Sequence, residues 1–220
     1  GGISRALTGF ANAVVGFVRG GLAHVTVISS MIISGITGSS VADASAIGTI
    51  MIPAMIKEGY RKDFATGLVA SATTVGVTIP PSIPFVIYGV ITGASIGKLF
   101  MGGMVPGFVF SFFAMIISFF ICRRQGVGAP KRFSFRELRH KTREGIWALL
   151  APVVILGGII GGVFTPTEAA AVGVLYALFV GFVIHKELKI KDMPQIILES
   201  AGTTAIVMLM VVGAFLYSWI

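Results

Sequence analysis

One apolar stretch with a polar interruption constrains the fold more than any other feature. Between residues 20 and 56 only His24 and Asp43 can titrate. A straight helix crosses the hydrocarbon of a bilayer with about 20 residues, so this stretch is too long for one crossing. Its Gly/Ser-rich middle, residues 35–40, leaves two halves that are short for two crossings. The pattern predicts a re-entrant helical hairpin over 21–56.

The expected hairpin tip carries residues that suit irregular backbone. Gly38 can adopt conformations closed to other residues, and the hydroxyls of Thr37, Ser39 and Ser40 can bond freed backbone groups. Ser40 is expected to cap the second helix. Non-helical backbone at membrane depth is tolerated only inside protein or against a water-filled cavity. The tip, with the intramembrane acid Asp43 one turn beyond it, is therefore a candidate ion or substrate site.

A second interruption follows at residues 79–84, Ile-Pro-Pro-Ser-Ile-Pro. Its three prolines remove amide donors and clash with a continuing helix. Neither flanking apolar segment, 64–79 or 85–91, is long enough to cross alone. We expect one crossing unwound near its middle, of the kind that binds substrate and ions in secondary transporters.

Composition assigns the class of protein. Hydrophobic residues form 55% of the chain, 12% are charged and the mean hydropathy is +0.94, which predicts an all-α, polytopic helical membrane protein. The single Cys122 excludes a disulfide framework. The net charge of +8 comes from basic residues beside apolar segments, which indicates membrane topology rather than nucleic-acid binding.

The expected organisation has four parts. We expect an interfacial amphipathic helix (1–20), a transport core of hairpin, unwound helix and following crossing (21–122), a basic cytoplasmic loop (123–145), and further crossings (146–220). In the last part Thr165, Pro166 and Glu168 have the spacing of a helix N-cap with a capping box. The chain starts at Gly1 and stops at Ile220 within an apolar segment, which suggests an internal piece of a longer protein.

The distribution of positive charge supports this topology. With both hairpin ends in the cytoplasm, every lysine and arginine except Lys98 falls on the cytoplasmic side. Two complete crossings in place of the hairpin would leave every later loop on the same side of the membrane. Only helix length and the chemistry of the tip argue against two crossings.

Four sequence blocks carry a resemblance to a known family. They are Gly-Ile-Thr-Gly-Ser-Ser-Val-Ala-Asp-Ala-Ser-Ala-Ile-Gly (35–48), Ile-Pro-Ala-Met-Ile-Lys-Glu-Gly-Tyr (52–60), Ile-Pro-Pro-Ser-Ile-Pro-Phe-Val-Ile-Tyr-Gly (79–89) and Gly-Val-Phe-Thr-Pro-Thr-Glu-Ala-Ala-Ala-Val-Gly (162–173). The chain resembles the large membrane subunit of TRAP transporters over nearly its whole length.

The resemblance implies sodium-coupled import of organic acid anions, such as dicarboxylates or sugar acids, across the bacterial inner membrane. It implies a periplasmic substrate-binding protein and a small four-helix membrane subunit as partners, and an elevator motion of a domain built from inverted repeats. Sodium would be the coupling ion, and no other cofactor is expected. A second hairpin and a second unwound helix would follow residue 220.

The candidate binding residues come from both interruptions. Carbonyl and hydroxyl oxygens suit a hard cation. The candidates for ion or substrate contact are Gly38, Ser39, Ser40, Asp43, Thr78, Ile79, Pro81 and Ser82, with sodium assigned to Gly38, Ser39 and Ser40. Asp43 fits either direct ligation or a role in bonding the tip. The structural alternatives are that the serines only cap helices and that the prolines only kink one.

Other functional classes fit less well. An enzyme would need a base beside a nucleophile, and no His or Lys can be placed next to a serine at depth. A passive channel would favour rings from repeated subunits over broken helices. A purely structural subunit would not need a polar tip. The strongest alternative is another ion-coupled anion transporter of elevator type, working without a binding protein.

Overall fold

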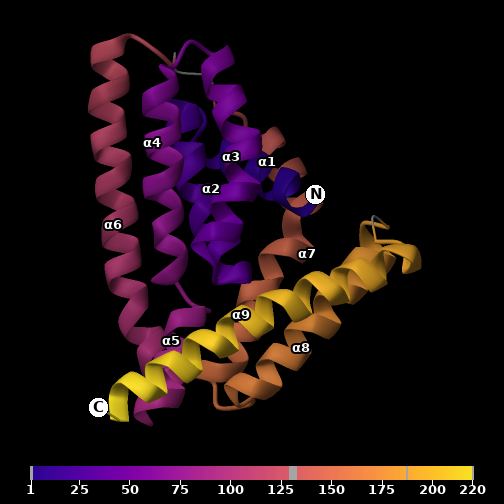
Figure 1. Ribbon diagram of the computed structural model, residues 1–220. Coiled ribbons are helices and arrows are strands. Elements are labelled where there is room, and N and C mark those ends of the chain that lie inside the picture. The colour runs from indigo at the N-terminus through magenta and orange to yellow at the C-terminus, as the bar shows by residue number, and fades with distance from the viewer. Residues whose placement is uncertain (1, 129–132, 187, 220) are drawn as a thin grey trace.

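The computed structural model describes residues 2–128, 133–186 and 188–219, and this part of the chain is helical without strands. Figure 1 shows the arrangement. The α-helices are α1 (Gly2–Val15), α2 (Gly21–Thr37), α3 (Ser40–Lys57), α4 (Lys62–Thr73), α5 (Ile83–Thr92), α6 (Ile96–Gln125), α7 (Phe135–Ile160), α8 (Pro166–Phe179) and α9 (Met193–Trp219). Shorter helical turns are η1 (Thr74–Val77), η2 (Val180–Ile184) and η3 (Ile190–Asp192).

Within the described residues, four helical segments are long and apolar enough to cross a bilayer: Ile96–Gln125, Phe135–Ile160, Pro166–Ile184 and Ile190–Tyr217. Their outer surfaces carry many exposed large apolar side chains, which lipid rather than water would cover. The all-α polytopic class expected from composition is confirmed.

The residues of the expected hairpin form two helices, α2 and α3, that pack against each other. The left-handed conformation of Gly38, with φ +62°, ends α2, and the Gly38 amide donates to the Ser34 carbonyl. The first helical residue of α3 is Ser40, so the N-cap is Ser39 and the expectation that Ser40 caps this helix was wrong by one residue. In Figure 1 the joined ends of α2 and α3 stop short of the lower end of α6.

Helix α2 lies at the centre of the molecule. Two clusters of buried apolar residues lie on either side of it. One joins it to α1, α3, α4 and α7 through residues such as Leu7 and Met51. The other joins it to α3, α4 and α6 through residues such as Met55, Leu68 and Cys122. The polar tip of the hairpin is therefore held by a well-packed base.

The break after α4 is confirmed, and it begins earlier than the prolines. The α-helix ends at Thr73, the tighter turn η1 runs to Val77, and α5 starts at Ile83. Because Pro80 and Pro81 have no amide hydrogen, the carbonyls of Gly76 and Val77 lose their partners one turn upstream. The peptide bond between the two prolines is cis.

Small residues on α6 make room for this irregular segment. A Cβ on Gly103 would contact the Thr78 carbonyl and the Phe85 ring, and a Cβ on Gly107 would lie 2.5 Å from the Ile79 side chain. Close backbone approach of this kind is the usual role of small residues between membrane helices.

The second half of the chain departs from the expectation mainly at helix starts. Residues 135–145, expected in a basic loop, form the first turns of α7, which the Ser134 side chain caps. Lys131 and Arg132 lie outside the described residues. Helix α9 begins at Met193. The capping box of Thr165 and Glu168 is confirmed at the start of α8.

Candidate functional site

The hairpin tip and the break after α4 meet at one place. The Ile83 amide donates to the Gly38 carbonyl over 3.3 Å. A Cβ on Gly38 would lie 2.6 Å from the Pro81 carbonyl oxygen, so the close approach requires glycine as much as its positive φ does. The structure therefore joins two clusters of candidate residues that lie about 40 positions apart in the sequence.

Asp43 is the centre of the polar contacts behind the tip. It is fully buried. Its carboxyl oxygens accept from the Ser34 hydroxyl at 2.6 Å and from the Thr37 hydroxyl at 2.5 Å. A Cβ on Gly76 would lie 2.5 Å from Asp43 Oδ2. The carboxyl group thus ties the end of α2 to the start of α3 and packs directly against η1, which is the geometry of a group that positions the tip.

The two tip serines have different surroundings. The Ser39 hydroxyl accepts from the Ala42 amide at 3.4 Å, and the Ser39 amide donates to the Thr37 hydroxyl at 3.3 Å. Ser40 is half-buried, and its hydroxyl has no hydrogen-bond partner among the described residues. Of the two, Ser40 has the hydroxyl that is free to contact a bound ion or substrate.

Ser82 holds the break in shape. Its hydroxyl donates to the Val77 carbonyl at 2.7 Å, the group that Pro81 leaves without an amide partner. The same oxygen accepts from the Phe85 amide at 3.5 Å as the N-cap of α5. The side chain is 1% exposed, so Ser82 satisfies buried backbone groups at both ends of the interruption.

Thr78 and Ile79 lie on the side of the break that contacts α6. The Thr78 carbonyl packs against Gly103, and the Ile79 side chain packs against Gly107. Ile79 is buried. The structure brings Gly38, Pro81 and Ile83 into direct backbone contact, and it does not bring Thr78 or Ile79 into contact with the hairpin tip among the contacts that it records.

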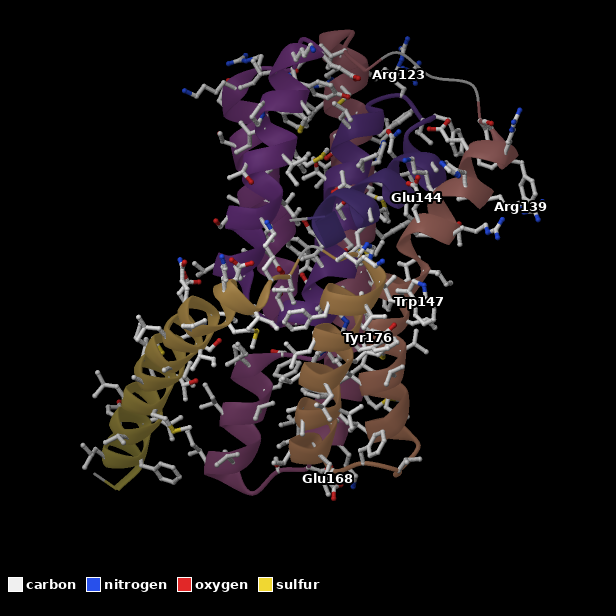
Figure 2. The ribbon with its side chains drawn as sticks, turned by 90° about the vertical axis from the view of Figure 1, so that its right-hand side faces the viewer. Arg123, Arg139, Glu144, Trp147, Glu168 and Tyr176 are labelled. Atoms are coloured by element: carbon white, nitrogen blue, oxygen red, sulfur yellow. The ribbon has the colours of Figure 1, made fainter. Side chains whose placement is uncertain are left out.

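A cavity of about 630 Å³ opens beside this cluster. Thr37, Gly38, Pro81 and Ser82 line its polar end, and apolar residues of α5, α7, α8 and α9 line the rest. Figure 2 shows two further lining residues, Trp147 on α7 and Tyr176 on α8, whose hydroxyl donates to the Trp147 carbonyl at 2.5 Å. None of the described lining residues is charged, so any anion here would be held without a salt bridge to them.

Helix ends give this cluster a defined electrostatic pattern. The N-termini of α3 and α5 lie at the tip and at the break, capped by Ser39 and Ser82. The C-terminal ends of α2 and η1 lie at the same two places. Amide groups at helix N-termini attract anions, and carbonyl groups at C-termini attract cations. The site therefore offers both kinds of partner within one small volume.

Two residues that contribute to the site were not among the predicted ones. Ser34 donates to Asp43 Oδ2, and a Cβ on Gly76 would lie against the same oxygen. In the sequence, nothing distinguishes Ser34 from the other small residues of an apolar helix. Gly76 did carry a signal, because an isolated glycine in a helical pattern usually has a packing or functional reason.

The described residues contain no group of three or more His, Cys, Asp or Glu side chains that could hold a metal ion. A cation at this site would depend on carbonyl and hydroxyl oxygens. That donor set suits a weakly held, exchangeable hard cation rather than a transition metal.

The long apolar helices define a polytopic membrane protein, and two of its interrupted helical segments meet beside a cavity. Over residues 1–220 the chain matches the family described as tripartite ATP-independent periplasmic transporter, DctM component. The chain belongs to this family, whose members are transport proteins and not enzymes.

Several curated relatives are similar over nearly the whole chain. The sialic acid TRAP transporter large permease protein SiaM of Vibrio cholerae is 43% identical over 219 residues, which is 100% of this chain and 51% of the relative. The C4-dicarboxylate protein DctM of Pseudomonas aeruginosa is 41% identical over 218 residues, 99% and 51% respectively. The 2,3-diketo-L-gulonate protein YiaN of Escherichia coli is 39% identical over 220 residues, 100% and 52%. The chain thus spans about half the length of these relatives.

Proposed function

We propose that this chain forms part of the large permease subunit of a secondary transporter that imports organic acid anions with sodium ions. Family membership supports transport, and the names of the relatives mention sialic acid, C4-dicarboxylates and a diketogulonate. All three are carboxylate compounds. The observation that carries the proposal is the junction of the hairpin tip with the broken helix at Gly38, Pro81 and Ile83.

Sodium is proposed to bind on the carbonyl side of this junction. The carbonyls of Gly76 and Pro80 each lack a partner four residues later, because residues 80 and 84 are prolines. The Cα of Ser40, whose hydroxyl is free, would lie 3.4 Å from a Cβ on Gly76, and Asp43 holds the tip in position through Ser34 and Thr37. A sodium ion bound here would be a transported substrate, taken up and released in each cycle.

The anion is proposed to bind in the adjoining cavity. Its carboxylate would face the N-termini of α3 and α5, since no lysine or arginine is among the described lining residues. The apolar walls would accept the carbon skeleton. A cation bound at the tip would neutralise part of the anion's charge, which gives a physical reason for coupled binding.

An elevator motion is proposed because the site is bonded internally. The tip and the break share the Ile83–Gly38 hydrogen bond, and Asp43 packs on η1. A unit joined in this way would cross the membrane as one body more readily than it would open from within. The arms α2 and α3 are proposed to be re-entrant, with both ends at the cytoplasmic face of the inner membrane.

The partners are proposed from the family: a small four-helix membrane subunit and a periplasmic substrate-binding protein. The test is uptake by the full-length permease reconstituted with the small subunit in liposomes. We expect uptake of a radiolabelled organic acid only with an inward sodium gradient and the purified binding protein. Uptake without the binding protein would favour an autonomous anion transporter, and uptake indifferent to sodium would refute the coupling.

A further inference from the structure

The first three turns of α7 carry a row of arginines on one face. Arg136, Arg139 and Arg143 follow one another at spacings of three and four residues, and at 3.6 residues per turn they fall within about 60° of each other around the helix axis. All three are exposed. Figure 2 shows Arg139 pointing away from the helix bundle, at about the level of Glu144, with Arg123 above it and Glu168 at the bottom of the view.

The opposite face of α7 packs against α1. A Cβ on Gly145 would lie 3.7 Å from the Ala6 carbonyl oxygen, and one on Gly9 would lie 3.4 Å from Cδ of Lys141. Gly145 and Ala148 are buried. Because this face is fixed against protein, the arginine face is directed outward.

The three arginines have no acidic partner within the described part of the chain. Over residues 123–128 and 133–147 there are six lysines and arginines against two acids, Glu137 and Glu144. The Glu144 carboxylate already contacts Lys141 at 2.7 Å and His140 at 3.0 Å. Glu137 lies in the first turn of α7, where the helix N-terminus favours a negative charge. The arginine face is thus a net positive surface.

Apolar groups flank this positive surface on both sides. Phe133 and Phe135 are 50% and 72% exposed just before Arg136. On the other side α7 continues as an apolar helix that could cross a bilayer, with Val153 63% exposed. Cations between exposed aromatic residues and an apolar crossing occupy the depth at which lipid headgroups lie.

We propose that Arg136, Arg139 and Arg143 bind the phosphate groups of anionic phospholipids and hold the α1–α7 pair at one membrane surface. The exposed phenylalanines would insert among the adjoining acyl chains. A guanidinium can donate two parallel hydrogen bonds to the oxygens of a phosphate. The net negative charge of an anionic headgroup, which a zwitterionic headgroup lacks, supplies the preference for anionic lipids. The proposal does not depend on sodium coupling or on the identity of the transported anion.

The test uses the intact transporter in nanodiscs of phosphatidylcholine with a minority of phosphatidylglycerol. After mild detergent exchange, mass spectrometry measures the ratio of the two lipids retained on the protein. We expect wild-type protein to enrich phosphatidylglycerol, and the enrichment to fall by about fivefold for each arginine changed to glutamine. The matched control is Arg61→Gln, because the Arg61 guanidinium is already engaged by Asp63.

Lysine substitutions and added salt test whether positive charge at this surface causes the lipid enrichment. Arg136→Lys, Arg139→Lys and Arg143→Lys together should retain most of the enrichment, and raising the salt concentration should weaken it in wild-type protein. Equal lipid ratios for wild type and the triple glutamine variant would overturn the proposal. Loss of the small membrane subunit from the triple variant, without any lipid enrichment in wild type, would assign the surface to that protein instead.

Discussion

Adding one methyl group at Gly76 should disable the site while leaving the rest of the fold in place. In the substitution Gly76→Ala the new Cβ would lie 2.5 Å from Asp43 Oδ2 and 3.0 Å from the Ser34 hydroxyl. Ordinary carbon–oxygen contact is closer to 3.4 Å, so the carboxyl group or η1 has to shift by about 1 Å. A shift of that size breaks at least one of the two hydroxyl bonds to Asp43.

The expected magnitude follows from these contacts. Inserting a methylene-sized group into a packed site costs about 1–3 kcal/mol, and a lost hydrogen bond to a buried carboxyl group costs a further 1–3 kcal/mol, approximately. Because the strain is relieved by moving the tip, we expect much of it to appear as weaker ion binding. Sodium-dependent uptake should fall by roughly 10- to 100-fold, since about 1.4 kcal/mol corresponds to a factor of ten.

The assay is initial uptake as a function of sodium concentration, together with the thermal stability of the purified complex. Gly67→Ala is the matched control, because it lies in the preceding helix and a Cβ there meets nothing within 4 Å. It should leave uptake unchanged. Normal sodium dependence in Gly76→Ala would refute the view that Asp43 needs the space which glycine provides.

Three further substitutions test neighbouring features. Asp43→Asn should abolish sodium-dependent uptake, because an NH2 group that only donates would replace one of the two oxygens that accept from Ser34 and Thr37; unchanged uptake would remove Asp43 from the site. Gly38→Ala, at φ +62° and 2.6 Å from the Pro81 carbonyl, should lower uptake at least tenfold by separating the tip from the break, and equal activity would show that this contact is dispensable. Thr165→Ala should lower thermal stability by about 1 kcal/mol through loss of the α8 cap with uptake per folded molecule retained, so a selective loss of uptake would contradict a purely structural cap.

The sequence predicted both interruptions of the helical pattern because their causes are local. Three prolines and a glycine act on the backbone within one turn of their own positions, as does the capping box at Thr165 and Glu168. Even here the exact cap was missed, because Ser39 and Ser40 are equally good caps and only the backbone conformation distinguishes them.

The contacts that assemble the site could not be predicted in this way. Whether Asp43 contacts Ser34, a carbonyl or an ion depends on the packing of α2 against α3. The sequence contains many serines that could equally well be its hydrogen-bond partner. The same holds for Gly76, whose contact is with a carboxyl group from another helix. Interactions between distant segments choose among local options that are nearly equal in free energy.

The contrast between the two sides of the cavity has a consequence for gating. The polar side is held together by hydrogen bonds, including the one between Ile83 and Gly38, whereas α9 contributes only apolar side chains to the other side. Breaking backbone hydrogen bonds where no water can replace them has a large free-energy cost. Separating two apolar helix surfaces within lipid has a small one, because lipid tails can cover both surfaces. The cavity should therefore open by movement of its apolar side, while its hydrogen-bonded side stays fixed.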